Sequence, residues 1–216
     1  MTKPTLIYAY DPLCGWCYGF YPVLEKLLQR FEGKLDAEVK TGGLVTGERV
    51  TSIKDGHSYI IDGMQQVEKV TGVQFGQNFK LLAEEGSYIY DSLPPCRAQV
   101  TVNKLALDKA VPFAGAMQRA LFKEGKNLNE TDTYLQITED LGIDSGSFLE
   151  LYNDDWSKIE AESEFAWCQK AGATGFPTLM LKVGNEFGIM ARGYRPYDTI
   201  ESHLHHLLNN LEKLTS

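Results

Sequence analysis

The sequence predicts an α/β fold whose core is interrupted by a long helical segment. Three observations lead to this prediction. The chain opens with the pattern strand, helix, strand, and it closes with two strands and a helix. Between residues 45 and 173, apolar residues recur mostly at helical spacing, and no segment has a convincing strand pattern. The simplest architecture is an α/β core formed by the two ends of the chain, with a helical insertion between them.

The opening unit follows from hydrophobic periodicity. Residues Thr5–Tyr10 form a short apolar and aromatic run that is typical of a buried strand. Apolar residues then recur at steps of three and four over residues 20–31, which predicts one apolar face of a helix ending near Gly33. Over residues 35–40, apolar and charged side chains alternate, as expected for a half-buried second strand.

The middle of the chain contains several helix signals. Helices are expected over residues 97–110, 112–124 and 131–141. Ser157 and Glu160 are three residues apart and predict a capping box for a further helix, which Gly172 would end.

The closing unit contains a hairpin and a final helix. Residues 178–183 and 186–191 have strand character, and Gly184-Asn185 between them is a two-residue hairpin turn. Asp198 and Glu201 are also three residues apart and predict the cap of the last helix.

Composition and charge exclude several classes of protein. The 216 residues are 43% hydrophobic and 23% charged, which is typical of a globular chain. The formal net charge of −8 disfavours binding to nucleic acid or to an anionic membrane surface. No segment has the roughly 18 consecutive apolar residues of a membrane span, and the first ten residues lack the pattern of a secretory signal. We therefore expect a cytoplasmic protein with neither nucleic-acid nor membrane partners.

Two of the four cysteines, Cys14 and Cys17, lie three residues apart between the first strand and the first helix. In a cytosolic chain this placement is typical of a redox pair. Residues three apart in the first helical turn share a face, so the two sulfurs can join in a short, reversible disulfide. The helix N-terminus favours a thiolate on the first of them. We expect Cys14 to be the attacking thiolate and Cys17 to be the more buried, resolving thiol.

Two alternatives explain the same pair without redox chemistry. Free cysteine is often a small buried hydrophobic residue, and Cys-x-x-Cys can also be half of a zinc site. Zinc would need two further ligands at matching spacing, whereas Cys96 and Cys168 are isolated in the sequence. We expect no metal at the site and no bound cofactor, because the thiols themselves carry the electrons.

Three further features match a known family. They are the motif Asp11-x-x-Cys14-x-Trp16-Cys17-Tyr18-x-Phe20, a proline at position 22, and the segment Gly175-Phe176-Pro177-Thr178-Leu179. In these features the chain resembles the DsbA family of the thioredoxin superfamily, particularly its FrnE-like branch. The resemblance implies a discontinuous thioredoxin-like domain over residues 1–45 and 174–216 and an all-helical insertion domain over residues 46–173.

The resemblance also implies roles for individual residues. In the family, the proline that corresponds to Pro177 is cis and lies beside the active-site sulfurs. The backbone of Phe176 would then face Cys14 and pair with an extended substrate peptide as an added strand. Trp16, Phe176 and Pro177 are accordingly the expected substrate-binding residues. The alternative for Pro177 is a proline that merely opens a strand.

The sequence departs from the family pattern at two positions. Tyr8 stands where thioredoxin and the periplasmic DsbA proteins carry a buried acid, six residues before the first cysteine. Gly15 follows the first cysteine, where FrnE-like proteins often have proline. The role of the buried acid in proton transfer therefore cannot be carried over, and Tyr8, Asp11 and water remain alternatives.

The other cysteines, histidines and glycines have ordinary explanations. Cys96 is either a third thiol near the active site or a buried residue near a helix start, and Cys168 is expected in the core. A disulfide between them has no support from their spacing. His203, His205 and His206 are expected on the exposed face of the last helix, where His203 and His206 are one turn apart and could share a metal. The sequence does not indicate a role for His57. Gly42, Gly43 and Gly47 are expected in turns.

The sequence thus predicts a thiol-disulfide oxidoreductase or isomerase in which Cys14 attacks and Cys17 resolves. Its expected partners are protein thiols and disulfides, with glutathione or a thioredoxin-type protein as reductant. A reducing cytosol favours reduction or isomerisation of client disulfides. One alternative is a glutathione-dependent isomerase or a kappa-like glutathione transferase, which needs only one sulfur or a serine. The other is a non-enzymatic peptide-binding module.

Overall fold

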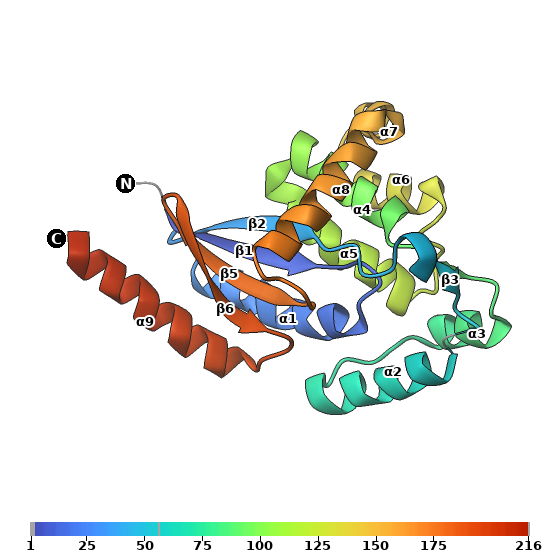
Figure 1. The fold of residues 1–216 in the computed structure, drawn as a ribbon, viewed down its shortest axis with the longest axis horizontal. Helices are drawn as coiled ribbons and strands as arrows, with labels where there is room; N and C mark the ends of the chain where they lie inside the picture. Colours follow the sequence, from blue (N-terminus) through green and yellow to red (C-terminus); the bar gives the residue numbers. More distant parts are fainter. Residues whose placement is uncertain (1–2, 56, 216) are drawn as a thin grey trace.

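The core of the protein is a four-stranded mixed sheet with the strand order β2-β1-β5-β6. The computed structural model describes residues 3–55 and 57–215 (Figure 1). β1 (Thr5–Tyr10) pairs in parallel with β2 (Asp36–Thr41) and antiparallel with β5 (Thr178–Val183). β5 in turn pairs antiparallel with β6 (Glu186–Arg192). Both ends of the chain therefore contribute to one sheet, and the predicted α/β fold is confirmed.

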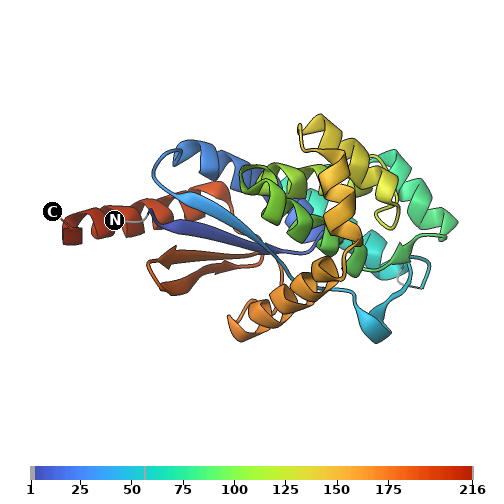
Figure 2. The same ribbon diagram turned by 90° about the horizontal axis from the view of Figure 1, so that it is seen from above.

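Alternate residues of β1 lie in two different packed layers, because successive side chains of a strand point to opposite faces. Leu6, Tyr8 and Tyr10 belong to the main hydrophobic cluster, which includes residues of α1 (Gly15–Arg30) and α9 (Tyr197–Thr215). Ile7 and Ala9 belong to a second cluster that contains residues of α8 (Asp155–Lys170). Figure 2 shows α1 and α8 on opposite sides of the sheet.

The first helix begins immediately after Cys14. Cys14 is the N-cap residue of α1, and Pro22 lies inside the helix. The helix ends at Arg30, and Gly33 follows with a φ of +75°, a left-handed conformation that glycine adopts without steric cost. The predicted end of the helix is therefore confirmed.

The segment between the two halves of the core is mainly helical, but it also contains a small sheet. β3 (Thr51–Ser52) and β4 (Ile89–Tyr90) form an antiparallel pair. The expectation of an all-helical insertion is wrong in this detail, because strands of two residues are too short to give an alternating pattern. The helices of this segment are α2 (His57–Thr71), α3 (Gln77–Glu85), α4 (Leu93–Leu105), α5 (Ala110–Phe122), α6 (Thr131–Asp140), α7 (Ser145–Asn153) and α8, with short 3-10 turns over Gly47–Arg49 and Leu107–Lys109.

Four predicted helix starts differ from the observed ones. α5 begins at Ala110 rather than at residue 112. α4 begins at Leu93 rather than at residue 97, because prolines are tolerated in the first turn, where backbone N–H groups have no helical partner. α8 is capped by Asp154, whose carboxylate accepts a hydrogen bond from the Trp156 amide at 2.7 Å. Ser157 is not the cap, and its hydroxyl donates to the Tyr152 carbonyl at 2.7 Å. α9 begins at residue 197, one residue before the predicted cap Asp198.

Candidate active site

The two cysteines of the motif lie at the N-terminus of α1. The Sγ atom of Cys14 accepts a hydrogen bond from the backbone N–H of Cys17 at 3.3 Å. The Cys14 carbonyl also accepts from the amides of Cys17 and Tyr18, at 3.0 and 3.1 Å. Cys17 is completely buried, and Cys14 retains 6% exposure. Cys17 is thus the more buried of the two, as expected, although Cys14 is itself more enclosed than we expected of an attacking thiol.

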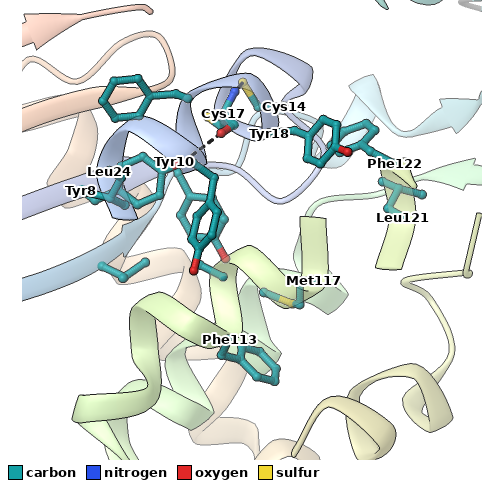
Figure 3. Packing of buried hydrophobic residues seen from close by; sticks show 14 of the residues in the cluster. Tyr8, Tyr10, Cys14, Cys17, Tyr18, Leu24, Phe113, Met117, Leu121 and Phe122 are labelled. Atoms are coloured by element: carbon teal, nitrogen blue, oxygen red, sulfur yellow. Dashed lines mark hydrogen bonds between the residues drawn. The ribbon is translucent and has the colours of Figure 1, made fainter. Parts of the chain in front are cut away.

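The surroundings of Cys17 keep it protonated. Burial raises the pKa of the Cys17 thiol well above its usual value, and the adjacent Cys14 raises it further. Below Cys17, the Tyr8 hydroxyl donates to the Cys17 carbonyl oxygen at 3.4 Å, and the Tyr8 ring stacks on Tyr10 (Figure 3). Burial also raises the pKa of Tyr8 well above its usual value. Tyr8 therefore stays a neutral phenol that donates a hydrogen bond, and it does not act as a proton acceptor near neutral pH.

The Phe176-Pro177 segment directly precedes β5, the strand that pairs with β1, and it faces Cys14. The peptide bond between the two residues is cis. The Cys14 thiol donates to the Phe176 carbonyl oxygen at 3.5 Å, although the two residues are 162 positions apart in the chain. The Pro177 carbonyl accepts from the Gly193 amide at 2.7 Å, which ties this segment to the end of β6.

Gly42 lies directly against the ring of Phe176. A Cβ atom at position 42 would be 1.9 Å from the Phe176 Cζ atom, so only glycine leaves room for the ring. The sequence placed Gly42, Gly43 and Gly47 in turns. Gly43 and Gly47 have φ values of +63° and +59°, as turn glycines do, whereas Gly42 serves a close approach between two segments.

Cys14 and Trp16 open onto a cavity of about 500 Å³ between the start of α1 and the middle segment of the chain. Its lining is mostly apolar, and the charged side chains that line it are Arg49 and Asp62. The apolar wall includes Leu44, Ile53, Met64, Val67, Phe75 and Phe79. Sequence reasoning did not identify these residues as part of a site, because apolar side chains at helical spacing look the same whether they line a cavity or fill a core.

An aromatic residue beyond the motif also contacts the site. The ring of Tyr194, in the loop after β6, lies 6.3 Å from the rings of both Trp16 and Phe20. Sequence reasoning missed Tyr194. Its only signal is the sequence Gly-Tyr-Arg-Pro directly after the predicted hairpin, which reads as an ordinary turn.

Cys96 and Cys168 lie apart from the redox motif. All four cysteines are free thiols. Cys96 is fully buried in α4, and its Sγ atom lies 4.0 Å from a carboxylate oxygen of Asp11. Cys168 is fully buried in α8 and donates to the Thr41 carbonyl at 3.5 Å. Burial raises the pKa of Cys168 to about 12 and that of Cys96 well above its usual value. Both are core residues without a thiolate near neutral pH.

The three histidine side chains that the structure describes all lie on α9. His203, His205 and His206 are exposed on α9, as the sequence predicted, and His206 Nε2 is 3.0 Å from Asn210 Nδ2. The side chain of His57 lies outside the described residues. Within residues 3–55 and 57–215, no three His, Cys, Asp or Glu side chains gather as metal ligands would. In the same residues, none of the helices combines the length and apolar character that crossing a bilayer requires.

These features together define a thioredoxin fold with a Cys-x-x-Cys pair at a helix N-terminus and a cis-proline beside it. The family model of the DSBA-like thioredoxin domain matches residues 5–205. The chain therefore belongs to the DSBA-like thioredoxin domain family and has the fold of its thiol-disulfide oxidoreductases. A search of curated proteins found no match.

Solved structures of similar proteins cover nearly the whole chain. One, from Nitrosomonas europaea and described as a "putative protein disulfide isomerase", is 29% identical with a TM-score of 0.86, over 96% of this chain and 98% of that one. The cytosolic disulfide reductase DsbM from Pseudomonas aeruginosa is 28% identical with a TM-score of 0.79, and the match covers 95% of this chain and 98% of DsbM. A second structure of DsbM contains GSH. A 2-hydroxychromene-2-carboxylate isomerase shares the fold, with a TM-score of 0.68 and 16% identity. The match covers 98% of this chain and 100% of the isomerase.

Proposed function

We propose that the protein is a cytoplasmic thiol-disulfide oxidoreductase that reduces or isomerises disulfides of proteins or small thiols. The observation that carries this proposal is the placement of the Cys14 sulfur. It lies at the N-terminus of α1, between the amide of Cys17 at 3.3 Å and the carbonyl of Phe176 at 3.5 Å, and it faces the cavity. Helix N-termini stabilise a thiolate, and the cavity gives a client disulfide access to it.

The reaction proceeds by two exchanges that move two electrons. The Cys14 thiolate attacks one sulfur of the client disulfide, so that a mixed disulfide forms and the other client sulfur leaves as a thiolate that takes up a proton. The Cys17 sulfur then attacks the Cys14 sulfur, the S–S bond between Cys14 and the client breaks, and the proton of the Cys17 thiol passes to the client sulfur, which leaves as the second thiol. The protein is left with a Cys14–Cys17 disulfide. Two molecules of an external thiol reduce this disulfide and become oxidised themselves.

The surfaces on either side of Cys14 would hold the client. Phe176 is half-buried beside Cys14, so its backbone would pair with an extended protein client, and Pro177 would lie next to that client. Trp16 would contact the part of the client that enters the cavity. In this proposal, residues 1–45 and 174–216 form the redox domain, and the insertion domain of residues 46–173 supplies the opposite wall of the cavity.

The relatives support a reducing role. DsbM is a cytosolic reductase and has been crystallised with GSH, which favours glutathione as the reductant here. A cytosolic glutathione pool keeps a pair with an ordinary potential in the dithiol form. The presence of both Cys14 and Cys17 distinguishes this function from a glutathione transferase or isomerase, in which one sulfur would suffice.

The substitution Cys17→Ser tests the proposal. Without a resolving thiol, the mixed disulfide between Cys14 and its client should accumulate, and reduction of a peptide disulfide by glutathione should stop. Non-reducing gels and mass spectrometry measure the trapped species. Cys168→Ser is the matched control, because a serine hydroxyl can still donate to the Thr41 carbonyl. It should turn over like the wild type.

Two results would contradict the proposed function. One is wild-type protein that does not exchange disulfides with glutathione or a peptide. The other is a Cys17→Ser variant that turns over at the wild-type rate, because that would leave a chemistry that needs one sulfur only.

A further inference from the structure

Asp11 is a buried carboxylate at the centre of three segments that meet beside the active site. It is completely buried in the loop between β1 and α1, three residues before Cys14. Its Oδ1 atom accepts from the Leu13 amide at 2.9 Å and from the Ser92 hydroxyl at 3.0 Å. Its Oδ2 atom accepts from the Leu44 amide at 2.7 Å. One side chain thus joins the loop that carries Cys14, the loop after β2 and the residue that precedes α4.

Burial raises the pKa of the Asp11 carboxyl, and the hydrogen bonds that it accepts from Leu44, Leu13 and Ser92 act in the opposite direction. Both backbone groups that reach it are N–H donors, and the Ser92 hydroxyl already accepts from the Val45 amide at 3.0 Å, so its hydrogen is free to point to Asp11. None of the ion pairs among the described residues includes Asp11. Four hydrogen bonds, one of them a long contact from the Cys96 thiol at 4.0 Å, rather than a cation in contact, therefore compensate the burial of this carboxylate.

Two of the segments that Asp11 joins, the loop that carries Cys14 and the loop after β2, line the cavity. Leu13 is adjacent to Cys14 in the chain, and the Cys14 amide donates to the Asp11 carbonyl at 3.0 Å. Leu44 and Val45 line the cavity together with Cys14. The Ser92 amide also donates to the Val45 carbonyl at 2.7 Å, which holds the loop after β2 a second time.

We propose that Asp11 is a positioning residue for disulfide exchange, because its carboxylate sets the distance between Cys14 and the cavity wall formed by Leu44 and Val45. This inference rests on the proposed function. Asp11 does not touch the reacting sulfurs in this role, and it acts through Leu13 and Leu44. Clients that must fit between Cys14 and the wall depend on it, whereas small reagents that reach Cys14 alone do not.

The substitution Asp11→Asn separates these two classes of reaction. Asparagine has nearly the same shape, and its oxygen can still accept from Leu13 and Ser92. Its amide group would then face the Leu44 N–H, and two donors cannot form a hydrogen bond. We expect the hydrogen exchange of the Leu44 amide to accelerate at least tenfold. We also expect the KM for a peptide disulfide to rise about fivefold or more, with a smaller change in kcat, since misplaced binding groups weaken the productive complex. Alkylation of Cys14 by iodoacetamide should stay within threefold of the wild type.

Asp91→Asn is the matched control. The Asp91 carboxylate accepts from the Leu93 amide two residues further on at 2.9 Å, as Asp11 does from Leu13. Asp91→Asn makes the same change from carboxylate to amide at the residue next to Ser92. The side chain of Asp91, however, forms no hydrogen bond with the loop that carries Cys14 among the described residues. We expect its KM and its Leu44 exchange rate to equal those of the wild type.

Ser92→Ala provides a second variant if Asp11→Asn does not fold. It removes one hydrogen bond to the carboxylate and the acceptor for the Val45 amide, while the charge stays in place. An increase in KM of at least threefold would support the positioning role.

The inference is overturned if a folded Asp11→Asn protein has a wild-type KM, or if Asp91→Asn raises the KM as much as Asp11→Asn does. If Asp11→Asn does not fold, an unchanged KM in Ser92→Ala overturns it. Failure of the proposed function is a different result, because it would be seen in the wild-type protein.

Discussion

The contact between Gly42 and Phe176 leads to a prediction about how the active site is held together. In Gly42→Ala the new methyl group would lie 1.9 Å from the Phe176 Cζ atom, whereas ordinary contacts begin at 3.4 Å. The ring must therefore withdraw by about 1.5 Å, and a small-to-large change of this kind typically costs about 1 to 3 kcal/mol. Gly42 does not have a positive φ, so the effect is steric and not a matter of backbone strain.

We expect the stability cost to lie near the lower end of this range, because Phe176 is only half-buried and its ring can move toward solvent. The functional cost should be larger. The Phe176 carbonyl contacts the Cys14 thiol, and a displacement of about 1 Å near reacting groups can lower a rate by about a hundredfold. We predict that the rate of peptide disulfide reduction falls by about ten- to a hundredfold, while the midpoint of urea unfolding moves only slightly.

Gly188→Ala is the control for this experiment. Gly188 lies in β6 and does not have a positive φ, and a methyl group added there would have no neighbouring atom within 4 Å among the described residues. It should leave both stability and turnover unchanged. If a folded Gly42→Ala protein reduced disulfides within twofold of the wild-type rate, then the position of Phe176 would not matter for exchange.

Two further predictions follow from buried groups. Iodoacetamide at pH 7.5 should label Cys14 and leave Cys17 unlabelled. Burial excludes the reagent from Cys17 and raises the pKa of its thiol, which therefore stays protonated well above neutral pH. Peptide mass spectrometry measures the two labelling rates, and equal rates would contradict this prediction. Glu164→Gln should lower the free energy of unfolding by about 2 to 4 kcal/mol. The substitution leaves Lys40 without its charged partner at 2.9 Å and weakens two hydrogen bonds that Thr41 donates. Urea denaturation measures the loss, and a loss below about 0.5 kcal/mol would refute this prediction.

The parts of the structure that the sequence predicted are those with a local signal. The strands of the core and the helix after Cys14 follow from hydrophobic periodicity, and the position of Cys14 and Cys17 in the first turn of that helix follows from their spacing of three residues. The juxtaposition of Phe176 with Cys14 was expected only from the family resemblance, because local patterns carry no information about contacts between residues 162 positions apart.

The parts that the sequence did not predict depend on tertiary contacts. The wall of the cavity consists of apolar residues such as Ile53 and Phe79 whose periodicity is that of ordinary core helices and strands. The sequence could not decide whether Tyr8, Asp11 or water takes part in proton transfer either, because that depends on what surrounds each group. The structure shows Tyr8 as a buried hydrogen-bond donor and Asp11 as the acceptor for three segments.

The strand order of the core has a consequence for the synthesis of the protein. β1 is translated first and its parallel neighbour β2 soon after it, but its other neighbour is β5, which begins at Thr178. A nascent chain on the ribosome therefore carries both thiols and an unpaired, apolar strand edge long before the segment that covers them has been translated. The sheet and the contact between Phe176 and Cys14 are therefore completed only when the last strands dock.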